Sequence, residues 1–208
     1  MSTGARQRRH CTGAILAGGR SARFGGRAKG LERVGGVRII DRVADALRDA
    51  CEDVRLIAND DAAVAWLPGV TVVRDLRPGN GPLGGIHAAL EHAPDAILVL
   101  AWDAPFASAA LLRALREAGE RDDADAAVPA SNAPWGFEPL CAWYGPRCRM
   151  AVTRSLDAGD TRSGGWQSQV RTVRVDASAW GASERIFFNV NTSEDLVRAQ
   201  SFATAAPG

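Results

Sequence analysis

The chain has 208 residues, of which 46% are hydrophobic, and its 25 Lys and Arg residues nearly balance 24 Asp and Glu residues, for a formal net charge of +1. These values fit one globular domain with an ample core. They give no general electrostatic argument for a nucleic acid or a membrane surface as partner, and no run approaches the roughly 20 apolar residues that span a bilayer.

The N-terminal residues and the cysteines indicate the compartment. Residues 1–12 carry basic side chains, but the apolar segment of a signal peptide does not follow them. The four cysteines show no CxxC pair and no zinc-like spacing, so we expect reduced, structural thiols. A cytoplasmic, soluble protein is the expectation.

A glycine-rich loop dominates the N-terminal part, where residues 13–31 read GAILAGGRSARFGGRAKGL. The apolar run 14–17 stops at Gly18 and Gly19, which predicts a buried strand that opens into a loop. Glycines let several backbone N–H groups approach an anion, and cations add charge to those amides. Here the cations are Arg20, Arg23, Arg27 and Lys29. The pattern therefore predicts a phosphate-binding loop.

Two observations bear on how specific that prediction is. Neither the dinucleotide fingerprint nor the P-loop motif fits these glycines, so an arginine-rich surface loop is the alternative. Lys29, however, is the only lysine of the chain. Where arginine meets nearly every other need for positive charge, a single lysine in the loop indicates a requirement for a compact charge on a flexible stem.

The next segments alternate between helical and strand patterns. Apolar spacing predicts a helix over 39–50, followed by a strand at 54–58, a short helix at 60–66 and a strand at 70–73. This order favours parallel strands with helices on the faces of the sheet. Because ligands lie beyond the carboxyl ends of such strands, we expect Gly18, Gly19, Asn59 and Asp75 at one edge of the sheet.

The most apolar strand, residues 96–101, is predicted to be central in the sheet and ends shortly before Asp103. A carboxylate at the tip of a buried strand is well placed to hold Mg²⁺ against nucleotide phosphates. The alternative is a turn with Pro105 or a cap for the helix expected at 108–118. Upstream, residues 77–85 are irregular, and a helix from about Pro82 carries His87 and His92, which we expect to be exposed or capping.

The second half is predicted to contain neighbouring strands at 124–129 and 138–144, a helix at 147–158, an edge strand at 170–175 and a last helix from Ser193. Arg162 can bind a phosphate bidentately. The alternative is that it is one of the chain's many arginines without a role in the site. Asn189 and Asn191 are two apart in an extended segment, so their side chains face the same way. They suit a magnesium shell or a phosphate, although turn chemistry is the common use of such a pair.

These motifs resemble one family. The run LAGGRSARFGGRAKGL is similar to the signature loop of the molybdenum cofactor guanylyltransferases, with Phe24 where Met is usual and Ala28 where Asp is usual. GPLGGI at 81–86 resembles the family's second signature, which lies against the nucleotide base. Asp103 and Arg162 match its metal carboxylate and a pterin contact, and residues 187–192 (FFNVNT) resemble its closing motif. The similarity covers residue 13 to about 200.

The resemblance implies an α/β fold: a single Rossmann-like three-layer α/β/α domain with a mainly parallel, mixed sheet of the nucleotide-diphospho-sugar transferase type. We expect a disordered tail at 1–12 and one nucleotidyltransferase domain at 13–202. Its nucleotide-binding half would span about 13–105, and its acceptor-binding half about 106–202.

The implied reaction is transfer of GMP from GTP to the phosphate of molybdopterin (Mo-molybdopterin), with release of pyrophosphate and with Mg²⁺ as cofactor. The catalytic residues would be Lys29, Arg23 and Asp103. Nucleotide binding would involve Leu16, Ala17, Gly18, Gly19, Lys29, Asn59, Asp75, Gly81, Pro82, Leu83 and Asp103. The metal would be held by Asp103, Asn189 and Asn191, and the acceptor by Arg162, Asn189 and Asn191. Transient contact with molybdoenzymes or their chaperones is left open.

Three other functions stay open. A cytidylyltransferase for the same pterin or a sugar-1-phosphate nucleotidyltransferase would use the same scaffold, because base choice depends on a few hydrogen bonds. With Ala28 in place of Asp, a module that binds the cofactor without turnover is the alternative from another class.

Overall fold

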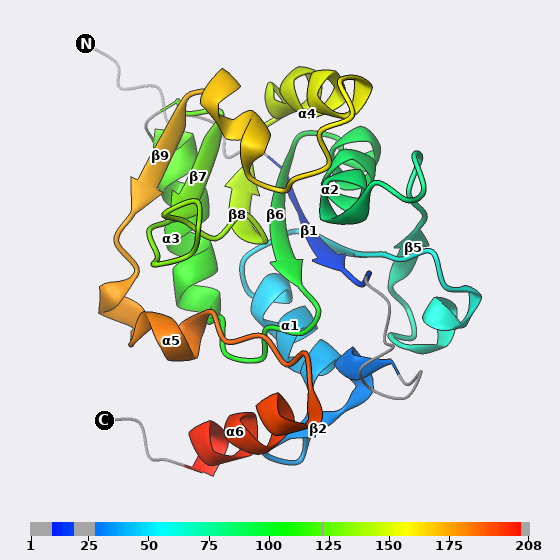
Figure 1. The fold of residues 1–208 in the computed structure, drawn as a ribbon, viewed down its shortest axis with the longest axis vertical. Coiled ribbons are helices and arrows are strands. Elements are labelled where there is room, and N and C mark those ends of the chain that lie inside the picture. Colours follow the sequence, from blue (N-terminus) through cyan, green and yellow to red (C-terminus); the bar gives the residue numbers. More distant parts are fainter. Residues whose placement is uncertain (1–9, 19–27, 122, 205–208) are drawn as a thin grey trace.

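A computed structural model of the chain describes residues 10–18, 28–121 and 123–204. Its centre is a sheet of seven strands in the order β5-β4-β1-β6-β8-β7-β9 (Figure 1). The strands are β1 Cys11–Leu16, β4 Asp53–Ile57, β5 Thr71–Val73, β6 Ala96–Ala101, β7 Ala126–Pro129, β8 Cys141–Tyr144 and β9 Thr172–Val175. Only β8 runs antiparallel to its neighbours in this sheet. The predicted α/β class, mixed sheet and central strand are confirmed.

Four helices cover the two faces of the sheet. They are α1 Ile39–Arg48, α2 Gly81–His92, α3 Ala109–Arg121 and α4 Cys148–Asp157. Alternate side chains of β6 point to opposite faces of the sheet. Leu98 packs in the core cluster with α1 and α3, whereas Ile97 and Val99 pack in the core cluster with α2 and α4. Two cores, one on each face, make the three-layer architecture that the resemblance implied.

Helix α2 differs from expectation at one histidine. His87 is buried, with only 6% of its surface exposed, whereas His92 is exposed and its Nδ1 lies 2.9 Å from the Ala88 carbonyl oxygen. The prediction that His87 is exposed or capping is therefore wrong. Every residue from Leu83 to Leu90 is buried, because α2 packs against the sheet and α4 packs against α2. Burial removes the amphipathic pattern that would have revealed the orientation of His87.

Shorter elements complete the chain. They are the hairpin β2 Arg33–Val34 and β3 Val37–Arg38, the 3₁₀ turns η2 Lys29–Leu31, η3 Asp61–Ala65, η4 Gly165–Gln169 and η5 Ser178–Trp180, and the helices α5 Ser183–Ile186 and α6 Ser193–Thr204. The expected tail at 1–12 lies outside the described residues up to residue 9, and β1 already begins at Cys11.

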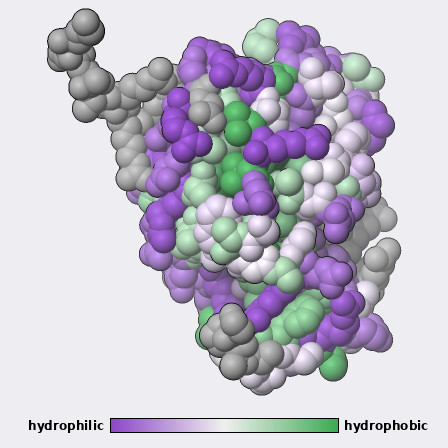
Figure 2. Space-filling view, turned by 90° about the vertical axis from the view of Figure 1, so that its left-hand side faces the viewer, coloured by the Kyte–Doolittle hydropathy of each residue, from purple (hydrophilic) through white to green (hydrophobic). Residues whose placement is uncertain are grey.

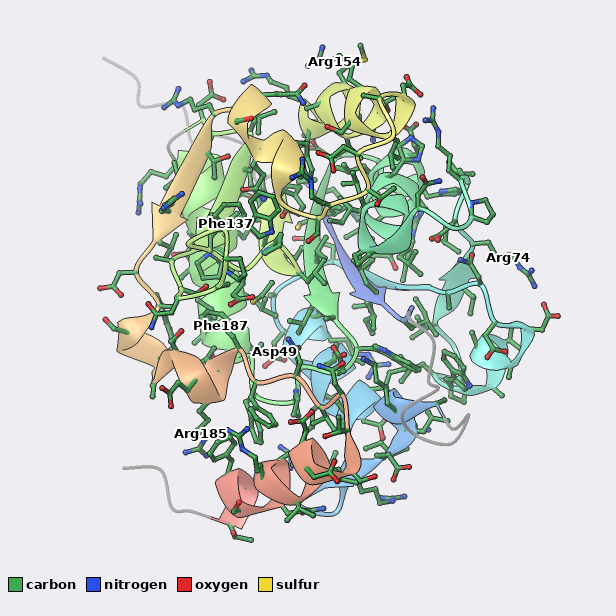
Figure 3. All side chains as sticks on the ribbon, viewed as in Figure 1. Asp49, Arg74, Phe137, Arg154, Arg185 and Phe187 are labelled. Carbon is green, nitrogen blue, oxygen red and sulfur yellow. The ribbon has the colours of Figure 1, made fainter. Side chains whose placement is uncertain are left out.

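The C-terminal segment returns to the N-terminal part of the chain. Helix α6 lies beside β2 at one end of the molecule (Figure 1), where the Gln200 side chain donates to the Arg33 carbonyl and accepts from the Gly35 N–H, at 2.7 and 3.0 Å. Arg185 from α5 reaches toward α6 (Figure 3) and donates to the Phe202 carbonyl at 2.9 Å. These bonds fix the segment between α5 and α6, which contains the predicted Asn189 and Asn191.

The surface carries no single large apolar region among the large hydrophobic side chains of the described residues. The exposed ones, Val37, Val64, Leu76, Met150 and Val197, come from separate segments. On the face shown in Figure 2, hydrophilic residues surround a small green area. The four cysteines are free thiols, as predicted. Among the described residues, no helix is long and apolar enough to cross a membrane.

Candidate active site

The carboxyl ends of β1, β4, β5 and β6 lie level with one another. Backbone bonds extend past the strands, from Ala17 N–H to the Ile57 carbonyl, from Ala58 N–H to the Val73 carbonyl and from Trp102 N–H to the Leu16 carbonyl, at 2.9, 2.9 and 3.2 Å. Parallel strands therefore deliver the residues that follow them to one edge, as the sequence predicted.

A cavity of about 760 Å³ opens at this edge. It is lined by Leu16, Ala17, Gly18, Lys29, Ile57, Ala58, Asn59, Asp75, Gly79, Gly81, Pro82, Gly85, Ala101, Trp102, Asp103 and Leu140. The structure thus gathers most of the predicted nucleotide-binding residues around one space. Leu83, in the first turn of α2, is instead fully buried in the core, and Gly19 lies outside the described residues.

Lys29 and Asp103 meet at one side of the cavity. The Lys29 ammonium donates to a carboxylate oxygen of Asp103 and, at 2.7 Å, to Oδ1 of Asn191. The side chains of Lys29 and Asp103 are only 13% and 11% exposed. The predicted pair, 74 positions apart in the chain, is therefore in direct contact and largely shielded from water. Arg23, its predicted helper, lies outside the described residues.

Asn191 is held by the start of α6. A carboxylate oxygen of Asp195 accepts from the N–H groups of Asn191 and Thr192, both at 3.0 Å, and the Thr192 hydroxyl accepts from the Asp195 N–H at 3.1 Å. This reciprocal arrangement is a capping box. The cap fixes the backbone at Asn191, so its amide is presented to Lys29 from a rigid element. Asn189 is exposed and is not among the cavity-lining residues.

Asn59 and Asp75 form a second polar pair on the lining. Nδ2 of Asn59 donates to the Asp75 carboxylate, and the Asp75 N–H donates to Oδ1 of Asn59, each at 2.9 Å. Gly79, in the loop that follows, and Gly81, the first residue of α2, have φ angles of +87° and +57°, which side chains disfavour. The reciprocal bonds hold the carboxylate in one orientation beside this loop.

Arg162 lies elsewhere. Its guanidinium pairs with Asp160 through two bonds of 2.8 Å, and this contact lowers the pKa of Asp160 to about 2. The same guanidinium lies over the Trp135 ring, 5.7 Å from its centre. Arg162 is described by the structure but is not one of the residues that line the cavity.

The oxygen donors at this edge suit a magnesium ion. No three His, Cys, Asp or Glu side chains among the described residues gather as a metal site. Mg²⁺, however, is typically held by one or two carboxylates together with substrate phosphates and water. Asp103 supplies a carboxylate and Asn191 an amide oxygen, and both contact the same ammonium. The residues present therefore fit the ion that the resemblance implied.

Several lining residues escaped the sequence prediction, among them Ile57, Ala58 and Gly79. The first two end or follow β4, so the rule that placed Asn59 at this edge could have found them. Trp102 is only 3% exposed and packs in the core, but it also lines the cavity.

Comparison with known proteins places the chain in a family. Residues 13–173 match the model of the MobA-like NTP transferase domain, which is well over half of the chain. The chain belongs to this family. It is therefore a nucleotidyltransferase, and the resemblance drawn from its motifs is confirmed.

Two relatives cover nearly the whole chain. The molybdenum cofactor guanylyltransferase of Desulfosudis oleivorans is 33% identical, over 91% of this chain and 94% of that protein. The probable molybdenum cofactor guanylyltransferase of Pelotomaculum thermopropionicum is 40% identical, over 92% and 93%.

Two solved structures share the architecture. Molybdopterin-guanine dinucleotide biosynthesis protein A from Archaeoglobus fulgidus superposes with a TM-score of 0.78 at 26% identity, over 93% of this chain and 98% of that one. A 2-C-methyl-D-erythritol 4-phosphate cytidylyltransferase from Thermus thermophilus gives 0.65 at 19% identity, over 92% and 98%. The similarity to the cytidylyltransferase supports the fold alone.

Proposed function

We propose that this chain transfers GMP from GTP to the phosphate of the molybdopterin cofactor and releases pyrophosphate. The observation that carries the proposal is the cavity in which Lys29 contacts Asp103 while Asn59 and Asp75 form a second polar pair. Its volume of about 760 Å³ lies within the range of about 300–1,000 Å³ that is usual for ligand sites. The guanylyltransferase names of the relatives support the choice of nucleotide and acceptor.

The reaction needs no protein nucleophile. An oxygen of the acceptor phosphate forms a bond to the α-phosphorus of GTP, the bond from that phosphorus to the bridging oxygen breaks, and the electron pair leaves with pyrophosphate. The protein's contribution is then to position the reactants and to stabilise the developing charge.

Lys29 has the main electrostatic role in this proposal. Negative charge grows on the leaving pyrophosphate in the transition state, and a shielded ammonium stabilises that charge more strongly than one in open water. Asn191 holds the ammonium from the α6 side, and Arg23 is its proposed helper. Mg²⁺, when bound at Asp103 with Asn189 and Asn191 as proposed further donors, supplies positive charge to the phosphate oxygens.

The remaining residues are proposed to bind the two substrates. Asp75, oriented by Asn59, and the turn at Gly81 and Pro82 would bind the nucleoside. Arg162, with Asn189 and Asn191, is proposed for the acceptor side. A cytoplasmic location and transient contact with molybdoenzymes or their chaperones belong to the same proposal.

The test is pyrophosphate release by the purified protein with Mg²⁺, molybdopterin and GTP, CTP or UTP in turn. GTP should be the preferred donor. Lys29→Ala should lower kcat by about 100-fold or more, as for a lost transition-state donor, and should change the melting temperature little. Arg154→Ala, which removes an exposed cation from α4 (Figure 3), is the charge-matched control.

The outcomes separate the alternatives. Preference for CTP would reject the guanine assignment in favour of a cytidylyltransferase, and turnover with sugar 1-phosphates in place of molybdopterin would reject the acceptor. Nucleotide binding without pyrophosphate release would support a binding module. Undiminished transfer by Lys29→Ala would contradict the role of the ammonium.

A further inference from the structure

The turn that carries Lys29 has little support of its own. It is a single 3₁₀ turn, η2, closed by backbone bonds from Leu31 N–H to the Ala28 carbonyl and from Glu32 N–H to the Lys29 carbonyl, at 2.9 and 3.1 Å. Ala28 occupies the N-cap position and makes no side-chain cap bond. Because such short turns are weak without a cap, the position of Lys29 must depend on tertiary contacts.

Trp102 provides one of these contacts. Gly30 is buried against its indole ring: a Cβ atom built on Gly30 would lie 2.4 Å from Cε3 and 2.8 Å from Cδ2 of the ring. Real Cβ atoms do not approach this closely, so only glycine lets the turn rest on the ring. The residue that follows Lys29 is thus in contact with the residue that precedes Asp103.

The indole is itself fixed from two sides. Trp66, at the end of η3, stacks on it with 5.0 Å between ring centres and 24° between ring planes. The backbone N–H of Trp102 donates to the Leu16 carbonyl at 3.2 Å, which ties this residue to the end of β1. Because Trp102 is anchored to the edge of the sheet and Gly30 packs on its ring, the turn is held in a fixed position relative to that edge.

We propose that Trp102 is the positioning residue for Lys29: its indole seats Gly30 and so holds the ammonium at the cavity. The inference deepens the proposed function, on which it rests. Trp102 replaces the support that a capping carboxylate at position 28 would give. The size of the flat ring matters for this role, and the N–H group of the indole does not, since Nε1 is buried without a hydrogen-bond partner among the described residues.

A double-mutant cycle between Trp102→Leu and Lys29→Ala tests the proposal. Misplacing a charge by about 1 Å can cost on the order of 100-fold in rate, so Trp102→Leu should lower kcat by about 10- to 100-fold in the native background. In the Lys29→Ala background the same change should lower kcat by less than about twofold, because an interaction that acts only through Lys29 has nothing left to lose.

The chain offers a matched control in Trp143. This indole is fully buried, it lies against Gly119 in the same way, with a built Cβ 2.2 Å from Cε3, and it is not among the residues that line the cavity. Trp143→Leu should destabilise the fold by a comparable amount, measured by urea unfolding. Its effect on kcat of the folded enzyme should be small and the same with or without Lys29.

A second readout does not depend on turnover. Calorimetry of pyrophosphate binding should show the same pattern, with Trp102→Leu weakening affinity only when Lys29 is present. If native protein binds pyrophosphate but does not use GTP, the proposed function fails while the cycle can still be read. If native protein turns over GTP but Trp102→Leu costs the same in both backgrounds, the positioning role is wrong and the proposed function stands.

Two further variants cover the case in which Trp102→Leu does not fold. Trp102→Phe retains a flat ring under Gly30 and should recover most of the native kcat. Gly30→Ala perturbs the same contact from the other side and should lower kcat with the same dependence on Lys29. Native kcat in folded Gly30→Ala would overturn the proposal.

Discussion

Replacing Lys29 by methionine should strengthen the binding of a divalent cation at Asp103 while nucleotide is absent. The Lys29 ammonium contacts the Asp103 carboxylate directly, so a metal ion must compete with it for the same oxygen. Methionine keeps the apolar stem and removes the charge. The variant thereby frees the carboxylate without opening a large cavity.

The expected magnitude follows from the contact. A hydrogen bond to a charged group contributes about 1.5–3 kcal/mol net. The two side chains are only 13% and 11% exposed, so solvent screens them little. Since each 1.4 kcal/mol is about a tenfold change in affinity, the dissociation constant for the ion should fall by about 10- to 100-fold.

Mn²⁺ is a suitable probe, because its binding can be followed by electron paramagnetic resonance and calorimetry without substrates. Arg154→Met is the control, since it makes the same change in net charge on the exposed side of α4. It should leave the affinity unchanged, and Asp103→Asn should abolish binding. A Lys29→Met protein that binds Mn²⁺ no more tightly than native protein would refute the competition between ammonium and metal.

Three further predictions concern stability, pH and the nucleotide. The Arg116 side chain is 1% exposed and pairs with Glu52 and Glu120. Arg116→Ala should lower the free energy of unfolding, measured with urea, by about 2–3 kcal/mol, which is less than the ~3–5 kcal/mol expected when a fully buried pair is broken. A loss under about 1 kcal/mol would contradict this prediction. Burial lowers the pKa of His87, so the unfolded chain binds the proton first and stability should fall as the pH drops below about 6.5. His87→Leu should flatten that slope in urea midpoints, and an unchanged slope would exclude His87 as its source. Asp75→Ala should weaken GTP binding about tenfold or more by calorimetry; native affinity would remove Asp75 from the site.

The cavity could be predicted where it depends on strand ends. Asn59 and Asp75 follow apolar strands, and Asp103 follows the most apolar one, so parallel pairing alone brings them to one edge. The pairing of Lys29 with Asp103 needed the resemblance, because no periodicity of the chain joins residues 74 positions apart. The motif order supplied what local pattern could not.

Other features were beyond reach for identifiable physical reasons. The strands of the hairpin at 33–38 have two residues each, too few to show alternation. His87 lies on a helix that is buried on nearly all sides, so its orientation leaves no periodic signal. The contact of Gly30 with Trp102 depends on tertiary geometry, and the sequence shows only a glycine and an aromatic residue far apart.

The amide that receives the second bond of Lys29 comes from residue 191, beyond the end of the family match at residue 173. Ribosomes make a chain from its N-terminus, so the nucleotide loop, the sheet and the carboxylate exist before this amide is translated. A nascent chain halted near residue 173 would therefore contain the whole matched domain and still lack a partner of its ammonium. A segment that is synthesised after the matched domain therefore completes the site.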